Sequence, residues 1–165
     1  MVAWTYSDHG AMRALYVFAY ARNGATQSVS FTPSRLGVSG RTYVYDYFNA
    51  TGHVLGDSET FNPTVSDGSY FVVAPVGPSG IALIGDRDKF ASLGRKRISQ
   101  LTDDGQLRAI VEFAPSEDSV SLIGYAASQP VVTVSGGSAQ DEQFDGQRFT
   151  VTLKREAISV QVTLQ

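Results

Sequence analysis

Hydrophobic and polar residues alternate along much of the chain with the period of two that is typical of β-strands. In residues 11–21 the aromatic positions fall on one face and the aliphatic positions on the other. Because both faces are apolar, we predict that this segment is a strand that is either buried on both sides or central in its sheet. Asn23-Gly24 and the alternation over residues 27–32 then predict a hairpin, since both turn residues tolerate positive φ.

Similar patterns recur over the rest of the chain and are separated by turn signals. Residues 41–48 place three tyrosines on one face, and residues 157–164 end the chain with another alternating run. Asp104-Gly105 and Asp145-Gly146 are further tight-turn signals. Turn signals at intervals of about 8–12 residues are typical of sandwiches and barrels. We therefore predict an all-β fold, a mostly antiparallel β-sandwich of two packed sheets with little or no helix.

One segment, residues 85–99, interrupts this alternation. An apolar run ends at Gly85, the charged sequence DRDK and Phe90 follow, and a basic cluster closes the segment. A chain of 165 residues can bury roughly 70% of the surface that its unfolded form exposes. We expect a single β-sandwich domain over residues 1–165, with residues 85–99 as the seam between two strand-rich halves.

The alternation also predicts which side chains fill the core. Each occupies an apolar position of a predicted strand, where burial is the main source of stability. The predicted core consists of Leu15, Val17, Phe18, Val44, Phe71, Val73, Ile81, Leu83, Val111, Phe113, Leu122, Phe149, Val151, Ile158 and Val160.

Composition and charge narrow the classes of function. The net charge of −3 argues against a nucleic-acid-binding protein, which would carry a basic surface. The chain has no cysteine, which excludes disulfides, thiolate metal sites and a cysteine nucleophile. No apolar run reaches the roughly 20 residues of a membrane helix, and no signal peptide is seen. We therefore expect a soluble protein without nucleic-acid or membrane partners, and the cytoplasm is favoured as its location.

Several stretches carry a more specific pattern. Residues 80–98 read GIALIGDRDKFASLGRKRI, in which an apolar strand leads into a Gly-x-x-Asp-x-Phe-x-Ser loop. This loop is formed by Gly85, Asp88, Phe90 and Ser92. Two more stretches with such a pattern follow this loop in the sequence, YAASQP and FDGQRFTVTL. Two others precede it, YVFAYARNGATQSVSFTPSRLG and RTYVYDYF. In this order, the stretches resemble the C-terminal β-sandwich domain of α-galactosidase-like and raffinose-synthase-like glycoside hydrolases.

The resemblance implies a non-catalytic accessory domain that packs against and supports a catalytic (β/α)8 barrel of a parent protein. The catalytic carboxylates of that family lie in the barrel. A chain of this length without periodic helices cannot form one. No catalytic residue can therefore be assigned here, and we expect that the isolated chain is not an enzyme and needs no metal or cofactor.

The residues themselves offer little for catalysis. A glycosidase needs two carboxylates at a defined separation, but the acidic pairs of this chain lie in predicted loops, where acids usually cap turns and pair with bases. Neither His9 nor His53 has the spacing of a catalytic triad or of a transition-metal site. A small glycosidase, or a calcium site at Asp86 and Asp88, remains an alternative.

The aromatic residues suggest a second possible function, the binding of a sugar. Sugars stack on exposed aromatic rings while their hydroxyls bind polar groups at the edge. Tyr43, Tyr45 and Tyr47, with Trp4, are candidates for such a platform; the same tyrosines are also typical of a cross-strand ladder that covers a core. The rival hypothesis is therefore a carbohydrate-binding module that binds an oligosaccharide.

Two groups of residues are candidates for a domain interface. One is the basic cluster Arg95, Lys96 and Arg97, which is suited to an acidic partner. The other is Trp4 with Tyr6. We predict that Trp4 is partly exposed in the monomer or is covered in a homodimer, because exposed apolar surface tends to mark an interaction site. The competing prediction is an edge strand over residues 2–6 that packs Trp4 inside.

Overall fold

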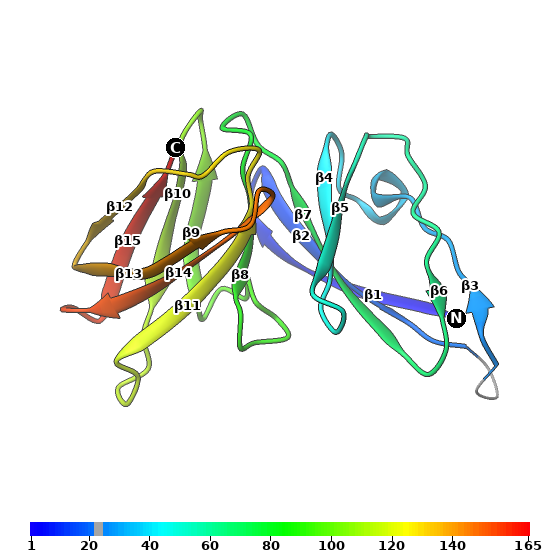
Figure 1. The fold of residues 1–165 in the computed structure, drawn as a ribbon, viewed down its shortest axis with the longest axis horizontal. Coiled ribbons are helices and arrows are strands. Elements are labelled where there is room, and N and C mark those ends of the chain that lie inside the picture. Colours follow the sequence, from blue (N-terminus) through cyan, green and yellow to red (C-terminus); the bar gives the residue numbers. More distant parts are fainter. Residues whose placement is uncertain (22–24) are drawn as a thin grey trace. The chain divides into compact units, whose positions relative to one another are not determined.

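The computed structural model describes residues 1–21 and 25–165, and these residues form an all-β fold. Helical structure among them is limited to the 3₁₀-helix Pro33–Leu36, which has neither the length nor the apolar character that a membrane crossing requires. The strand registers shown by the structure are antiparallel (Figure 1). The predicted all-β, mostly antiparallel fold is confirmed.

The chain divides into two compact units. The first contains Met1–Tyr6 and Arg13–Pro75, and the second contains Ser7–Met12 and Val76–Gln165. The main boundary lies at Pro75, where a strand ends because proline has no N–H to donate to a ladder. Residues 85–99, which we expected to separate two halves of a single domain, lie inside the second unit.

The first unit is built on a five-stranded sheet with the order β1-β2-β7-β4-β5, accompanied by a two-stranded sheet of β3 and β6 (Figure 1). Strand β1 forms one edge of the larger sheet and β5 forms the other. The strands of these sheets are β1 (Val2–His9), β2 (Met12–Ala19), β3 (Gln27–Ser28), β4 (Thr42–Asp46), β5 (Thr51–Leu55), β6 (Thr64–Val65) and β7 (Ser69–Pro75).

The predicted hairpin between residues 11–21 and 27–32 is wrong. β2 pairs with β7, whereas β3 pairs with β6, and the predicted turn at Asn23-Gly24 falls on residues outside the described part of the chain. The predicted central position of the first segment is confirmed, since β2 lies between β1 and β7. The aliphatic face of β2 is buried by segments that are distant in the sequence. This burial favours the pairing of β2 with β7 over a local hairpin, because strand preferences depend strongly on tertiary context.

The core of the first unit lies on one face of the five-stranded sheet. Leu15, Val17, Val44, Phe71 and Val73 supply that face, and side chains from residues 29–38 and from β6 cover it. Of the predicted core side chains in this unit, only Phe18 is wrong, because it is 44% exposed. Phe18 projects from the opposite face of β2, where its ring lies against Gly68 and beside Tyr20.

The second unit is a β-sandwich of two four-stranded antiparallel sheets. One sheet has the order β12-β15-β10-β9 and the other β13-β14-β11-β8 (Figure 1). Its strands are β8 (Ala82–Asp86), β9 (Ile98–Asp103), β10 (Leu107–Glu112), β11 (Ser119–Tyr125), β12 (Val132–Ser135), β13 (Gly137–Phe144), β14 (Arg148–Arg155) and β15 (Ser159–Leu164).

Local turn chemistry predicted two hairpins of this sandwich correctly. β9 pairs with β10 across Asp104-Gly105, and β13 pairs with β14 across Asp145-Gly146. Both glycines have a positive φ, +105° at Gly105 and +96° at Gly146, which side chains with a Cβ rarely adopt.

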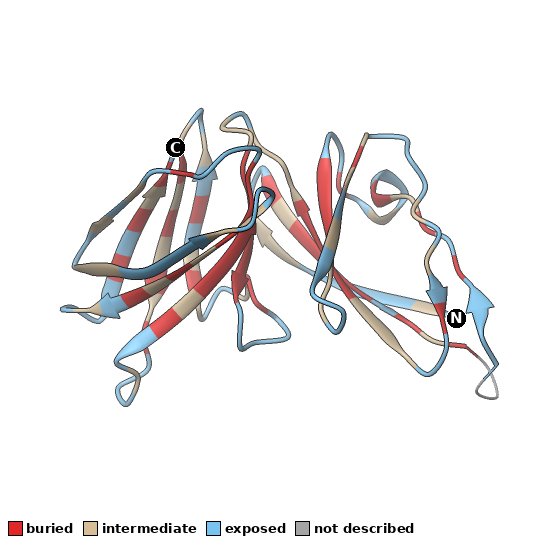
Figure 2. Cartoon of the chain, in the orientation of Figure 1, coloured by how far each residue is buried: buried red, intermediate tan, exposed pale blue. Residues whose placement is uncertain are grey.

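Alternate residues of the sandwich strands are buried, as the banding of β10, β14 and β15 in Figure 2 shows. The predicted core side chains of this unit are buried except Ile158, which is 72% exposed. That prediction is wrong because β15 begins at Ser159, so Ile158 lies in the preceding turn, where its carbonyl accepts the N–H of Phe113.

Candidate functional site

The three tyrosines of the predicted sugar platform do not form an exposed surface. Tyr43 and Tyr45 are buried and Tyr47 is half-buried. The Tyr43 ring covers Gly52 on the neighbouring strand β5, where a Cβ would lie 2.0 Å from the tyrosine hydroxyl oxygen. This is the cross-strand packing of an aromatic ring over glycine that stabilises a sheet. The faces of Tyr43 and Tyr45 are therefore not available to stack on a sugar.

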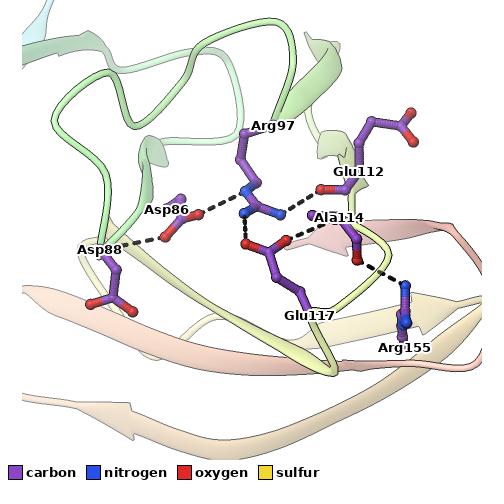
Figure 3. Close-up of polar contacts among 7 residues, drawn as sticks. All are labelled: Asp86, Asp88, Arg97, Glu112, Ala114, Glu117 and Arg155. Atoms are coloured by element: carbon purple, nitrogen blue, oxygen red, sulfur yellow. Dashed lines mark hydrogen bonds and ion pairs between the residues drawn. The ribbon is translucent and has the colours of Figure 1, made fainter.

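The loop that connects β8 to β9 is organised around Arg97, and residues 86–97 are called the Arg97 loop below. The guanidinium lies between two carboxylates (Figure 3). Its Nε is 2.7 Å from Oδ2 of Asp86, and its Nη2 donates to Oε1 of Glu117. Nη1 donates to the backbone carbonyl of Glu112. Arg97 thereby ties the loop to two other segments of the sandwich.

The remaining carboxylate oxygens of this cluster also have partners. Oδ1 of Asp86 accepts the N–H of Asp88 at 3.0 Å, and Oε2 of Glu117 accepts the N–H of Ala114 at 2.8 Å. The Asp86 side chain is only 4% exposed and that of Arg97 is 11% exposed. Charges buried to this extent persist only when they are paired and hydrogen-bonded. The cluster is therefore a clamp that fixes the loop.

Hydrogen bonding determines the ionisation of this cluster. The hydrogen bond from Arg97, helped by the N–H of Ala114, lowers the pKa of Glu117 to about 2. The same bond to Glu117 raises the pKa of the Arg97 guanidinium. Ionised partners make these bonds stronger than neutral ones. Both groups stay charged at neutral pH, so neither is poised to exchange a proton.

The backbone of the loop is held by a second set of contacts. Gly85 has φ = +109°, and a Cβ there would lie 2.3 Å from the carbonyl oxygen of Ser92. Asp86 donates its N–H to that carbonyl at 3.0 Å, and the buried hydroxyl of Ser92 donates to the carbonyl of Ile84. Gly85 and Ser92 of the Gly-x-x-Asp-x-Phe-x-Ser pattern thus have structural roles in closing the loop.

A groove of about 480 Å³ lies beside this clamp and is called the Arg97 groove. Phe113, Ala114 and Ala91 supply apolar lining. Phe90, which follows the charged sequence DRDK, also lines the groove and is 59% exposed. Lys89, Arg95 and Lys96, all exposed, line it as well.

The predicted basic interface cluster is split by the fold. Arg95 and Lys96 are exposed at the groove, but Arg97 faces inward and is engaged by Asp86 and Glu117. Arg97 also lines the groove, but its guanidinium already contacts these two carboxylates and the carbonyl of Glu112.

The aromatic residues near the N-terminus lie on the edge strand β1. Trp4 is 53% exposed and Tyr6 is 56% exposed, which confirms that Trp4 is partly exposed. Residues 2–6 also form the edge strand of the competing prediction, but without enclosing Trp4. Burial by a second copy of the chain stays a prediction.

Trp4 lines a groove of about 440 Å³, called the Trp4 groove. Its apolar floor includes the buried core residue Phe31 and the partly buried Leu36 and Val2, which pack against the core of the first unit. Polar side chains complete the lining: Ser30, Thr32, Arg35 and Thr60.

The two histidines belong to different units. His9 places Nε2 2.8 Å from the carbonyl oxygen of Leu93 in the second unit, and the ring of His53 in the first is tilted by 43° at a centroid distance of 5.8 Å from the ring of Phe61. Because a carbonyl only accepts, His9 Nε2 carries the proton of that bond. Within residues 1–21 and 25–165, no three or more His, Cys, Asp or Glu side chains are grouped to hold a metal ion.

Sequence reasoning missed the residues that complete both grooves. Glu117 and Asp118 form one of the acidic pairs in predicted loops, and Glu117 lies 20 residues from its partner Arg97. The sequence carries only a weak signal for this ion pair, namely that the basic residue Arg97 directly precedes the buried Ile98. Ser30, Arg35 and Thr60 gave no signal, because 26 to 56 positions separate them from Trp4 and only the fold brings them together.

Comparisons with known proteins do not assign this all-β protein to a family. No family model matches the chain, and no curated protein sequence matches it. Among the described residues, the Arg97 groove and the Trp4 groove give this all-β protein a candidate binding surface on each unit.

Proposed function

We propose that this chain is a non-catalytic accessory β-module of a glycoside-hydrolase-like protein, and that it supports a catalytic (β/α)8 domain by binding to it. The observation that carries the proposal is the clamped Arg97 loop, which presents an exposed phenylalanine beside an apolar groove with exposed basic side chains. The resemblance of residues 80–98 to the accessory domains of that family supports the same loop.

Phe90 is suited to be the anchor of this contact. An exposed aromatic ring gains most of its binding energy when it enters a pocket on the partner and loses its water. The loop costs little entropy on binding, because Arg97, Asp86 and Ser92 already hold its conformation.

The exposed bases determine which partner surface fits. Lys89, Arg95 and Lys96 line the groove, and the acids that line it are already hydrogen-bonded: Glu117 by Arg97, and Glu112 by Ser99 and Ser159. The surface therefore favours an acidic partner segment that carries an apolar side chain for the groove. Such charges increase the association rate and select the partner more than they add affinity.

A binding experiment tests the proposal. The probe is the catalytic barrel of an α-galactosidase-like enzyme produced without its own C-terminal domain, titrated with this chain by isothermal calorimetry. We expect a complex whose affinity falls at high salt. Phe90→Ala combined with Lys96→Glu should weaken it at least tenfold, because the anchor is lost and one charge is reversed.

Phe48→Ala is the matched control, since Phe48 is a comparably exposed phenylalanine (58%) in the first unit. This variant should bind like the wild-type chain. The proposal is contradicted if no complex forms, or if Phe90→Ala/Lys96→Glu binds as tightly as Phe48→Ala. Hydrolysis of nitrophenyl galactosides by the chain alone would contradict the non-catalytic assignment.

A further inference from the structure

Trp4 presents an aromatic ring that is not used by the fold. It is the single tryptophan of the chain and is 53% exposed on the edge strand β1. Among the described residues, no aromatic ring stacks on it and no cation lies over it. Its neighbour Tyr6, by contrast, has the Arg13 guanidinium 4.6 Å from its ring centroid. Trp4 is therefore the better of the two for stacking on a ligand.

The walls of the Trp4 groove provide hydroxyl groups beside this ring. Ser30 and Thr32 come from the chain that crosses the core face of the sheet, and Thr60 comes from the segment before Phe61. The Phe31 and Phe61 backbones hold these two segments together, and the hydroxyls of Thr32 and Thr60 are 3.0 Å apart. Each hydroxyl can both donate and accept.

Arg35 adds a positive charge to the same groove. It is exposed in the 3₁₀-helix Pro33–Leu36, and none of the described residues forms an ion pair or a hydrogen bond with its side chain. None of the described residues that line the groove is acidic. A guanidinium with free donors binds a carboxylate in a bidentate manner, so the groove is complementary to an anion.

We propose that the Trp4 groove binds a carboxylate-bearing saccharide, such as an oligosaccharide of a uronic acid. The apolar face of one pyranose ring stacks on Trp4, its hydroxyls bind Ser30, Thr32 and Thr60, and its carboxylate binds Arg35. An aromatic platform with a few convergent polar groups is the usual construction of a small-ligand site. The inference rests on the first unit alone and is independent of the proposed docking through the Arg97 loop of the second.

The sole tryptophan makes the test direct. The full chain is titrated with α-1,4-linked galacturonotriose and, separately, with neutral α-1,4-linked galactotriose, and Trp4 emission is followed. We expect the acidic sugar to shift and change the emission and to bind at least tenfold more tightly than the neutral one. High salt should reduce this difference, because it screens the Arg35 charge.

Two variants separate the contributions of the ring and the charge. Arg35→Gln should lower the affinity for the acidic sugar to that for the neutral sugar, whereas Arg41→Gln, an exposed arginine of the same unit outside the groove, should leave it unchanged. Trp4→Phe, followed by calorimetry, should weaken the binding of both sugars, and Phe48→Ala should not.

The inference is overturned if neither sugar binds, or if the acidic and neutral sugars bind equally. Wild-type affinity of Arg35→Gln for the acidic sugar would also overturn it. Circular dichroism that matches the wild-type chain establishes that each variant is folded, so a loss of binding then reports on the groove.

Discussion

At the scale of single residues, a large effect is expected at Arg97, because its side chain pairs with two carboxylates while only 11% exposed. Arg97→Met should lower the unfolding free energy of the second unit by about 3–5 kcal/mol, since it leaves the Asp86 charge buried without a partner. Differential scanning calorimetry measures this loss. Arg95→Met, at an exposed position, should stay within about 0.5 kcal/mol of wild type. A loss below about 1 kcal/mol for Arg97→Met would show that the clamp is not needed.

Glu117 gives the second unit a specific sensitivity to acid. Its pKa is about 2 in the folded chain against an ordinary value of 4.5. A carboxylate whose folded pKa is depressed stabilises the fold fully above the unfolded pKa and loses this contribution as the pH falls through the folded one. We expect Glu117→Gln to differ most from wild type at neutral pH and to converge with it between pH 4.5 and about 2. Urea unfolding followed by circular dichroism over this range would refute the assignment if the difference stayed constant.

The exposure of individual side chains was only partly predictable. The alternation gave Leu15 and Phe71 correctly as core positions, but it does not show how far along β2 each apolar face is covered. Phe18 was misassigned for this reason, since it is exposed while Tyr16 on the same face is buried. Which positions of a face are covered depends on segments that the fold brings in, such as residues 29–38 beside Leu15 and Val17.

At the scale of elements, the Arg97 loop depends on the backbone at Gly85. A residue with a side chain at a positive φ costs about 1–3 kcal/mol of stability. Gly85→Ala should destabilise the second unit by more than this, because the new Cβ would also overlap the Ser92 carbonyl. Gly105→Ala is the matched control, since Gly105 has φ = +105° and open space around it. Thermal unfolding compares the two; equal losses would mean that the contact with Ser92 imposes no constraint.

Hairpins with a strong local turn were predictable, whereas pairings between distant strands were not. Asp104-Gly105 joins strands that pair directly, and the turn residues indicate that pairing, although not the register shift between Ile110 and Val111. β3 instead pairs with β6, about 36 residues further along, which no local signal indicates. The Trp4 groove is formed by such distant segments, and for that reason its polar residues were not found in the sequence.

At the scale of the whole molecule, the first unit has a hydrophobic core of its own that depends on Phe71. This ring is 1% exposed and packs against Phe31 and Phe61. Phe71→Ala should lower the unfolding free energy reported by Trp4 emission by about 3–5 kcal/mol, because it leaves a cavity. Phe48→Ala, at a 58% exposed position, should have little effect. Similar values for both would mean that the core has been misplaced.

The all-β class could be predicted from the alternation and the spacing of the turn signals, but the division at Pro75 could not. Alternation identifies strands without showing which of them share a sheet, and a charged segment resembles a boundary even when it is clamped inside a unit. Residues 85–99 were misjudged in this way, because the pairing of Arg97 with Asp86 and Glu117 turns a charged sequence into an internal connection between two sheets.

The central claim, that the chain supports a catalytic domain through the Arg97 loop, is tested most directly by the melting temperature of that domain. A partner that binds only the folded state stabilises it by about 2.7 kcal/mol at 100 times the dissociation constant. We predict that the barrel of an α-galactosidase-like enzyme lacking its C-terminal domain melts several degrees higher with this chain, in a concentration-dependent manner, and that Phe90→Ala/Lys96→Glu abolishes the increase. An unchanged melting temperature at saturating wild-type chain would contradict the claim.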